Sequence, residues 1–287
     1  MRADIQQFLS FSLNNQTAFT PFSFQLDQQL QVNGPCPGVL EISPISKQKS
    51  NNRLRKSIVI SAGVHGNESA PIELVDSIIF DVFEGTLDIV HPVLFIYGNL
   101  PSIEQQVRFV EENLNRLFHY ADKSNSMESK RANILMQVVS AFFERKSTER
   151  LHYDLHTAIR PSKNEKFAVY PYLYDKSYDK SQLCFLSACD INTVLLSQAP
   201  TATFSDYSSS QHNAHAFTLE LGKVRPFGQN DMSRFVDIDK QLRQLISSDE
   251  VALPKYSDCA LEIFNVNQTI IKQQDDFKLH FEDDAPN

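Results

Sequence analysis

The stretch "SIVISAGVHGNESAP", residues 57–71, joins a short apolar run to a polar segment that carries His65 and Glu68. A short apolar run of this kind predicts a strand that is buried within a sheet. An imidazole and a carboxylate placed where that strand should end have no use in a solvated loop, but they are suited to binding a metal ion. The end of this strand is therefore the first candidate site.

The residues that follow predict a helix packed against the strand. Ser69 is the expected N-cap, and Pro71 falls in the first turn, where its missing N–H costs little. Apolar side chains then recur at helical spacing, at Ile72, Val75, Ile78, Ile79, Val82 and Phe83. A helix with one apolar face is typical of a helix that covers a sheet.

Strand-like and helix-like segments alternate along most of the chain. Further strands are expected at residues 92–98, 151–158, 166–172 and 214–222, and further helices at 129–145 and 231–247. This alternation predicts an α/β fold, in which a mostly parallel or mixed sheet is flanked by helices on both faces.

The pattern changes near residue 250, where short strand-like segments follow one another at 259–272 and 276–284 without a helix between them. We therefore expect a catalytic domain at residues 1–250 and the start of a small β-rich domain at 251–287, which looks truncated. The basic, polar segment 47–57 is expected to be a solvated connector.

Composition excludes several classes of function. The chain has 287 residues, with 27 Lys and Arg against 35 Asp and Glu and a net charge of -8, which argues against sequence-independent nucleic-acid binding. No apolar run is long enough for a membrane-spanning helix, and no signal peptide is evident. The four cysteines form no CxxC pair, so they are interpreted as reduced thiols in a cytoplasmic protein. A small-molecule substrate fits these limits; the oligomeric state is not indicated.

Three predicted strand ends supply side chains suited to metal chemistry. In an open α/β sheet, ligands bind beyond the carboxyl ends of the strands. The first end carries His65 and Glu68, a later one carries His156, and the strand at 214–222 carries Glu220. Two histidines and a carboxylate form a catalytic zinc set with a fourth position left for water, whose pKa zinc lowers to about 7. Glu220 is the candidate general base, because an unpaired carboxylate is costly to bury in an apolar strand.

Each of these signals has an ordinary structural explanation. A His-x-x-Glu spacing arises by chance in a chain with eight histidines, and a single His156 is more often a hydrogen-bonded core residue. On a strand, residues 152, 154 and 156 share one face, so His152 is interpreted as structural and Asp154 as a partner of His156. The joint occurrence at the ends of different strands favours a metal site.

Four blocks of sequence resemble the succinylglutamate desuccinylase/aspartoacylase family, whose fold is zinc-carboxypeptidase-like. The blocks are "VISAGVHGNESAP", "LNRLF", "DLHTAIRPS" and "FTLELGKVRPFGQND", and they occur in family order. The last block points to the desuccinylase branch. The resemblance implies one zinc ion per chain, held by His65, Glu68 and His156, with Glu220 as general base and then acid. It also implies hydrolysis of N-succinyl-L-glutamate to succinate and L-glutamate, the last step of arginine degradation by the succinyltransferase route.

The substrate implied by this resemblance carries three carboxylates, whereas the chain is net negative. Attraction must come from local cations, because charges on a protein surface are screened beyond about 8 Å in physiological salt. The resemblance places Arg108, Asn115 and Arg116 at substrate-binding positions, and Arg108 also suits stabilisation of an oxyanion. Arg160 is a further candidate, because Ser210 stands where relatives often carry an arginine; serine hydroxyls are the alternative.

Two other functions stay open at this point. One is a different N-acyl amino acid amidohydrolase, such as an aspartoacylase-like enzyme or a carboxypeptidase-like peptidase. The other is a catalytically silent zinc-binding protein.

Overall fold

The computed structural model describes residues 2–45, 55–119, 125–159, 163–174 and 176–268. The strands are β1 (Phe22–Leu26), β2 (Leu30–Gly34), β3 (Val39–Pro44), β4 (Ser57–Ala62), β5 (Val93–Tyr97), β6 (Arg150–Ala158), β7 (Lys166–Tyr170), β8 (Thr193–Leu196), β9 (His215–Lys223) and β10 (Glu262–Asn265). The helices are α1 (Arg2–Gln6), α2 (Phe8–Asn14), α3 (Ser69–Glu84), α4 (Leu100–Gln105), α5 (Met127–Phe143), α6 (Lys180–Ala188), α7 (Phe204–His212) and α8 (Val236–Ser247). Short 3-10 helices are η1 (Leu114–Arg116), η2 (Met232–Phe235) and η3 (Tyr256–Asp258).

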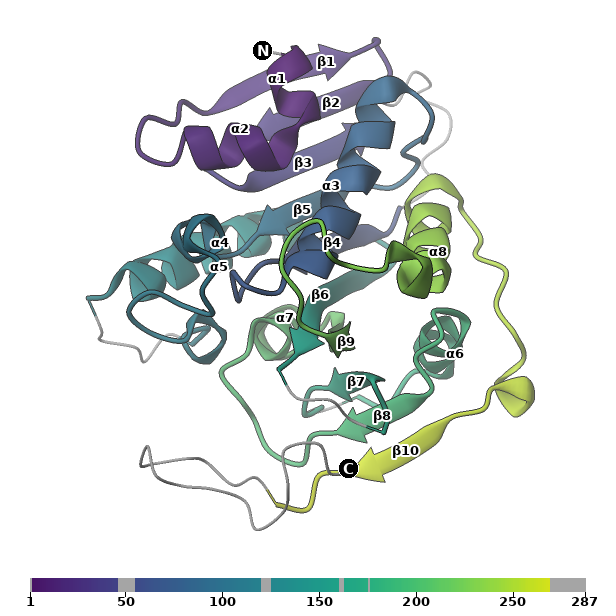
Figure 1. Cartoon of the computed structure of the whole chain (residues 1–287). Coiled ribbons are helices and arrows are strands. Elements are labelled where there is room, and N and C mark those ends of the chain that lie inside the picture. Colours follow the sequence, from purple (N-terminus) through teal and green to yellow (C-terminus); the bar gives the residue numbers. More distant parts are fainter. Residues whose placement is uncertain (1, 46–54, 120–124, 160–162, 175, 269–287) are drawn as a thin grey trace.

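All described strands belong to one mixed sheet in the order β1-β2-β3-β5-β4-β6-β9-β7-β8-β10 (Figure 1). The four middle strands, β5, β4, β6 and β9, are parallel. On one side the sheet continues through the antiparallel strands β3, β2 and β1. On the other side β7 runs antiparallel to β9, and β8 and β10 follow in parallel. The predicted α/β fold with a mixed sheet is therefore confirmed.

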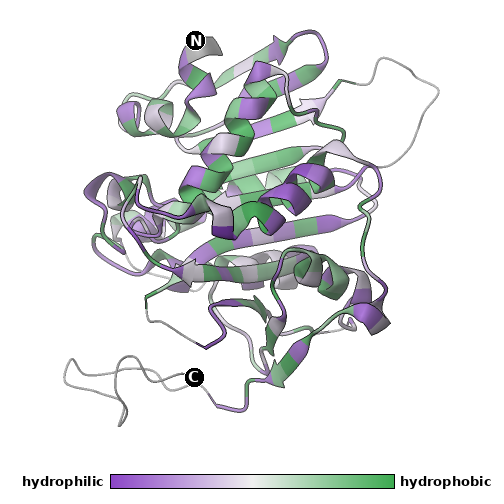
Figure 2. Cartoon of the chain, turned by 45° about the vertical axis from the view of Figure 1, so that its right-hand side comes forward, coloured by the Kyte–Doolittle hydropathy of each residue, from purple (hydrophilic) through white to green (hydrophobic). Residues whose placement is uncertain are grey.

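Helices cover both faces of the sheet. One core cluster joins β4 residues Ile58 and Ile60 to α1, α2, α3, α6 and α8. A second cluster joins Val59 of the same strand to α5 and α7. Successive residues of a strand point to opposite faces, so β4 contributes to both clusters. Figure 2 shows hydrophobic and hydrophilic residues side by side on the helices, as expected for helices with one face on a sheet.

The predicted middle strands and helices occur close to their expected positions, with two differences. Glu68, not Ser69, is the N-cap residue of α3, and the Ser69 hydroxyl instead donates a hydrogen bond to the Arg225 carbonyl oxygen at 2.6 Å. The expected Ser69 cap was therefore wrong, because a long-range partner takes its side chain. The expected helix 231–247 begins as η2 and becomes α-helical only at Val236.

The segment after residue 250 contributes β10, which pairs in parallel with β8 at the edge of the main sheet. The segment 276–284 and most of the basic connector lie outside the described residues. The division into domains at residues 1–250 and 251–287 stays a prediction. Among the described residues, no helix is both long and apolar enough to span a membrane.

Candidate active site

The carboxyl ends of β4 and β6 bring together His65, Glu68 and His156. Each of these buried residues offers one possible ligand atom, and the three atoms lie within 4.8 Å of one another. The β4–α3 connection that carries the first two residues passes close to α4. A Cβ atom at Gly66 would lie 2.0 Å from the Ser102 carbonyl carbon, so this close approach requires glycine.

Glu68 lies between the two imidazoles. Its Oε1 is 2.9 Å from His65 Nδ1, and its Oε2 is 2.9 Å from His156 Nδ1. The Thr157 backbone N–H also donates to Oε2, at 2.9 Å. Burial raises the pKa of Glu68, but the neighbouring His156 and His65 outweigh burial and hold that pKa well below its usual range. The carboxylate is therefore ionised in its buried position.

The outer nitrogen of each imidazole is held by a separate acceptor. His65 Nε2 is 2.9 Å from Asn113 Oδ1, and His156 Nε2 is 2.9 Å from Asp154 Oδ2. Asn113 Oδ1 also accepts the Asn115 backbone N–H, which supports its assignment as the oxygen. Because both partners are acceptors, each ring carries a proton on Nε2 and directs Nδ1 at Glu68.

This arrangement fits a bound cation. His65 Nδ1 has no hydrogen-bond partner within the described part of the chain, although Glu68 Oε1 is 2.9 Å away. Burial lowers the pKa of His156, but the charges of Asp154 and Glu68 outweigh burial and raise that pKa well above its usual value. These neighbouring negative charges favour a positive charge at this position. His65 and His156, through Nδ1, and Glu68, through its carboxylate, would be able to hold a divalent metal, which would supply the positive charge that this group of acceptors favours.

A chain of polar side chains lies behind His156, between β4, β6 and α7. Ser61 Oγ donates to Asp154 Oδ1 at 2.6 Å and is 2.8 Å from His152 Nε2. The other nitrogen of His152, Nδ1, is 2.7 Å from Ser208 Oγ. Burial lowers the pKa of His152 to about 4, so this ring is neutral at neutral pH. Asp154 contacts His156 as expected, and His152 has the structural environment that the sequence indicated.

Glu220 lies on β9, where it pairs in register with His156 on β6. Its Oε2 atom is buried and has no hydrogen-bond partner among the described residues. Burial raises the pKa of Glu220 to about 7, aided by Glu68 and opposed by His156 and Arg108. A carboxyl group with a pKa close to the working pH can both accept and donate a proton, as general acid–base catalysis requires.

Comparison with known proteins now assigns the family. A model of the succinylglutamate desuccinylase/aspartoacylase catalytic domain matches residues 55–246. The chain belongs to this family. The succinylglutamate desuccinylase of Pseudoalteromonas atlantica is 49% identical over 98% of this chain and 81% of that protein. The one from Shewanella denitrificans is 43% identical over 99% of this chain and 83% of that protein.

A solved structure of the same family has the same fold. The crystal structure of the succinylglutamate desuccinylase from Chromobacterium violaceum matches this chain with a TM-score of 0.88 at 39% identity. The match covers 98% of this chain and 86% of that one. The resemblance drawn from four short blocks is therefore confirmed over almost the whole chain.

The predicted substrate-binding residues of this family member lie in different settings. Arg108 Nη1 donates to Glu68 Oε1 at 2.8 Å, which places a cation beside the metal-ligand group. Asn115 is buried, and its Oδ1 accepts the Phe204 backbone N–H at the start of α7. Arg116 is exposed and donates to the Asn115 carbonyl oxygen. Arg160 lies outside the described residues, so its predicted role stays a prediction.

Proposed function

We propose that this family member is a zinc-dependent hydrolase that cleaves the amide bond of N-succinyl-L-glutamate and releases succinate and L-glutamate. The buried group of His65, Glu68 and His156 beside Glu220 carries this proposal. It is supported by relatives of 40% to 49% identity that are named succinylglutamate desuccinylases. One zinc ion per chain is expected, and a cytoplasmic location stays a prediction from the cysteine pattern.

The residues would divide the chemistry among them. His65 and His156, through Nδ1, and Glu68, through its carboxylate, would hold the metal. When bound, zinc supplies a Lewis acid and lowers the pKa of water. Asp154 and Asn113 keep the two rings oriented, because each holds the outer nitrogen of one ring.

Glu220 would move the proton. Its unpaired buried oxygen and its pKa of about 7 allow it to take a proton from the attacking water and pass it to the departing amine nitrogen. The guanidinium of Arg108 would stabilise the negative charge that develops on the carbonyl oxygen, since a fixed cation needs no reorganisation during the reaction.

Arg108, Asn115 and Arg116 would also bind the substrate carboxylates, with Arg160 as a further candidate. The arginines in this set must act locally, because the chain as a whole has a net charge of -8. An arginine fork can form two parallel hydrogen bonds with one carboxylate, which favours arginine over lysine in this role.

The test is release of glutamate from N-succinylglutamate by the purified protein, compared with hydrolysis of N-acetylaspartate and of a short peptide. We expect the succinyl substrate to react fastest, a chelator to abolish turnover, and added zinc to restore it. Faster hydrolysis of N-acetylaspartate or of the peptide would reassign the substrate. Zinc binding without hydrolysis of any of the three would favour a catalytically silent protein.

A further inference from the structure

The loop of residues 106–113, between α4 and η1, supplies one contact to each of two predicted metal ligands. Arg108 Nη1 donates to Glu68 Oε1 at 2.8 Å. Asn113 Oδ1 is 2.9 Å from His65 Nε2. The position of this loop therefore decides where a cation and a ring-orienting amide lie relative to the site.

The first half of this loop is tied to neighbouring backbone. The Val107 N–H donates to the Ser102 carbonyl oxygen at 3.0 Å, and the Gly66 N–H donates to the Arg108 carbonyl oxygen at 3.3 Å. The second half belongs to no strand or helix, and two of its side chains contact the start of α5: Glu111 Oε2 accepts the Met127 N–H at 2.8 Å, and Glu112 Oε2 accepts the Ser126 hydroxyl at 2.9 Å. Residues 110–112 are half-buried or exposed, and one side-chain group accepts all three of their backbone N–H groups.

That group is the carboxylate of Glu128, in the first turn of α5. Its Oε1 accepts the N–H of Val110 at 2.7 Å, and its Oε2 accepts the N–H of Glu112 at 3.3 Å. The Glu111 N–H lies between the two oxygens, at 3.2 and 3.3 Å. Asn99 Nδ2, beyond the end of β5, completes the set with a 3.2 Å bond to Oε1.

The surroundings of Glu128 favour the ionised form. The residue is only 1% exposed, and burial raises its pKa, but hydrogen bonds from Val110, Asn99 and Glu111 outweigh burial and leave that pKa below its usual value. The N-terminal end of a helix also favours a negative charge. Three consecutive N–H groups that converge on one carboxylate form an anion-binding concavity, here filled by the protein itself.

We propose that Glu128 is a positioning residue, which fixes the loop 106–113 and thereby sets Arg108 and Asn113 at the metal-ligand group. The expected effect of Glu128 on kcat rests on the proposed function. The expected effect on the position of the loop does not. A glutamine has a similar shape but only one acceptor oxygen, and its NH₂ group would face the loop N–H donors. Glu128→Gln should therefore release the loop without creating a cavity.

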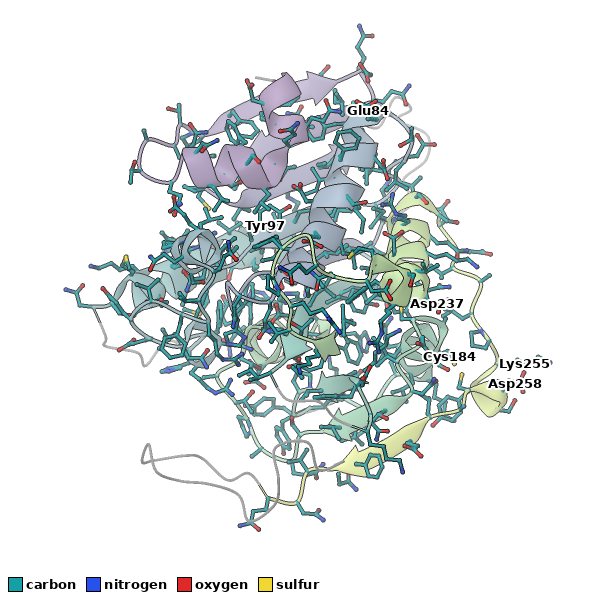
Figure 3. All side chains as sticks on the ribbon, in the orientation of Figure 1. Glu84, Tyr97, Cys184, Asp237, Lys255 and Asp258 are labelled. Carbon is teal, nitrogen blue, oxygen red and sulfur yellow. The ribbon has the colours of Figure 1, made fainter. Side chains whose placement is uncertain are left out.

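The structural consequence is tested by hydrogen exchange in the intact protein. In Glu128→Gln, we expect the amides of residues 110–112 to exchange at least about tenfold faster than in the wild type. Asp76→Asn is the matched control, because Asp76 also accepts a backbone N–H, from Leu9 at 2.9 Å, and a hydroxyl, from Tyr97 at 2.9 Å. Tyr97 is labelled in Figure 3. Unchanged exchange at residues 110–112 would overturn the proposal.

A second readout is zinc affinity, measured by competition with a chelator. Loss of a group that orients a metal ligand costs about 10- to 100-fold in affinity. We expect a loss of this size in Glu128→Gln, a smaller loss in Glu128→Asp, which keeps the charge, and none in Asp76→Asn. Wild-type affinity in both Glu128 variants would contradict the proposal, whatever the substrate of the enzyme.

The catalytic consequence is tested by a double-mutant cycle with Arg108→Ala. Because Glu128 is inferred to act through the loop, Glu128→Gln should lower kcat by about 10- to 100-fold and change KM less. In a protein that already carries Arg108→Ala, Glu128→Gln should lower kcat by a much smaller factor than it does in the wild type. If the loss of kcat in the double mutant equals the product of the losses in the two single mutants, Glu128 does not act through Arg108. A wild-type protein that does not hydrolyse N-succinylglutamate would refute the proposed function. Hydrogen exchange at residues 110–112 and zinc affinity would still test the role of Glu128.

Discussion

The carboxyl ends of the middle strands and the antiparallel edge of the sheet carry different kinds of side chain. At the carboxyl ends of β4 and β6, charged or ionisable groups are almost fully buried, with exposures of 2% for Glu68, 0% for Asp154 and 1% for His156. At the edge formed by β1, β2 and β3, half-buried aromatic rings pack against the core instead. Phe11 packs edge-on against Phe22, and Phe22 contacts Phe24 in turn.

The two regions contribute differently to the stability of the fold and to the chemistry of the site. Apolar burial at the edge stabilises the fold directly, by about 25 cal/mol for each Å² removed from water. Buried ion pairs in the middle add little net stability, because desolvation offsets much of their attraction. The carboxyl ends of the middle strands are therefore suited to the proposed binding of a cation and transfer of a proton, and changes in the two regions should have different consequences.

The largest expected effect follows from removing a ligand in the middle. His156→Ala should release zinc and reduce hydrolysis to background, because Glu68 and His65 alone leave a metal with too few protein ligands. Elemental analysis of the purified variant measures this directly. Full zinc occupancy in His156→Ala would contradict the ligand assignment.

A smaller but still large effect is expected at Glu220. Glu220→Gln should keep its zinc and lower kcat by about 10²- to 10⁴-fold, the usual scale for losing general acid–base catalysis. Glu144→Gln, at the exposed end of α5, is the matched control and should behave like the wild type. Turnover at the wild-type rate in Glu220→Gln would exclude its role in proton transfer.

The pH dependence of wild-type activity should be steep below neutrality. Glu220 must be ionised to accept a proton, and burial raises its pKa to about 7, so acidification protonates it early. We expect kcat/KM to fall about tenfold per pH unit below that value, which amounts to about 100-fold at pH 5. Measurement of kcat/KM from pH 5 to 9 would show this decrease on the acidic side. A value of kcat/KM that does not change with pH would argue against Glu220 as the base.

The smallest effect is expected at the edge. Ile42 on β3 is fully buried, and Ile42→Val should lower the free energy of unfolding by about 1 kcal/mol, the usual cost of removing one methylene from a core. Zinc content and kcat should stay unchanged. Chemical denaturation measures the free energy of unfolding. A clear change in kcat would show that the two regions are coupled.

The two regions also differ in how far the sequence alone predicts them. The middle strands are continuous apolar runs followed by polar motifs, so β4, β6 and β9 and the convergence of His65, Glu68, His156 and Glu220 could be predicted. At the edge, β1 alternates between exposed and half-buried residues until Leu26, and such short mixed segments carry little periodic signal.

The sequence did not identify the residues that orient the site. Asn113 meets His65 across 48 residues, and Glu128 meets the loop amides across 16 to 18 residues. These contacts depend on the course of an irregular loop, and no spacing rule predicts that course. The wrong assignment of Ser69 as a cap has the same origin, since its hydroxyl binds Arg225 from a distant segment.

The most direct test is an anomalous difference map at the zinc absorption edge, from crystals of the wild-type protein grown with zinc. The account predicts one strong peak about 2.0–2.2 Å from Nδ1 of His65, Nδ1 of His156 and a carboxylate oxygen of Glu68, with the Glu220 carboxylate facing it. No peak at this position, or a peak held by other residues, would contradict it.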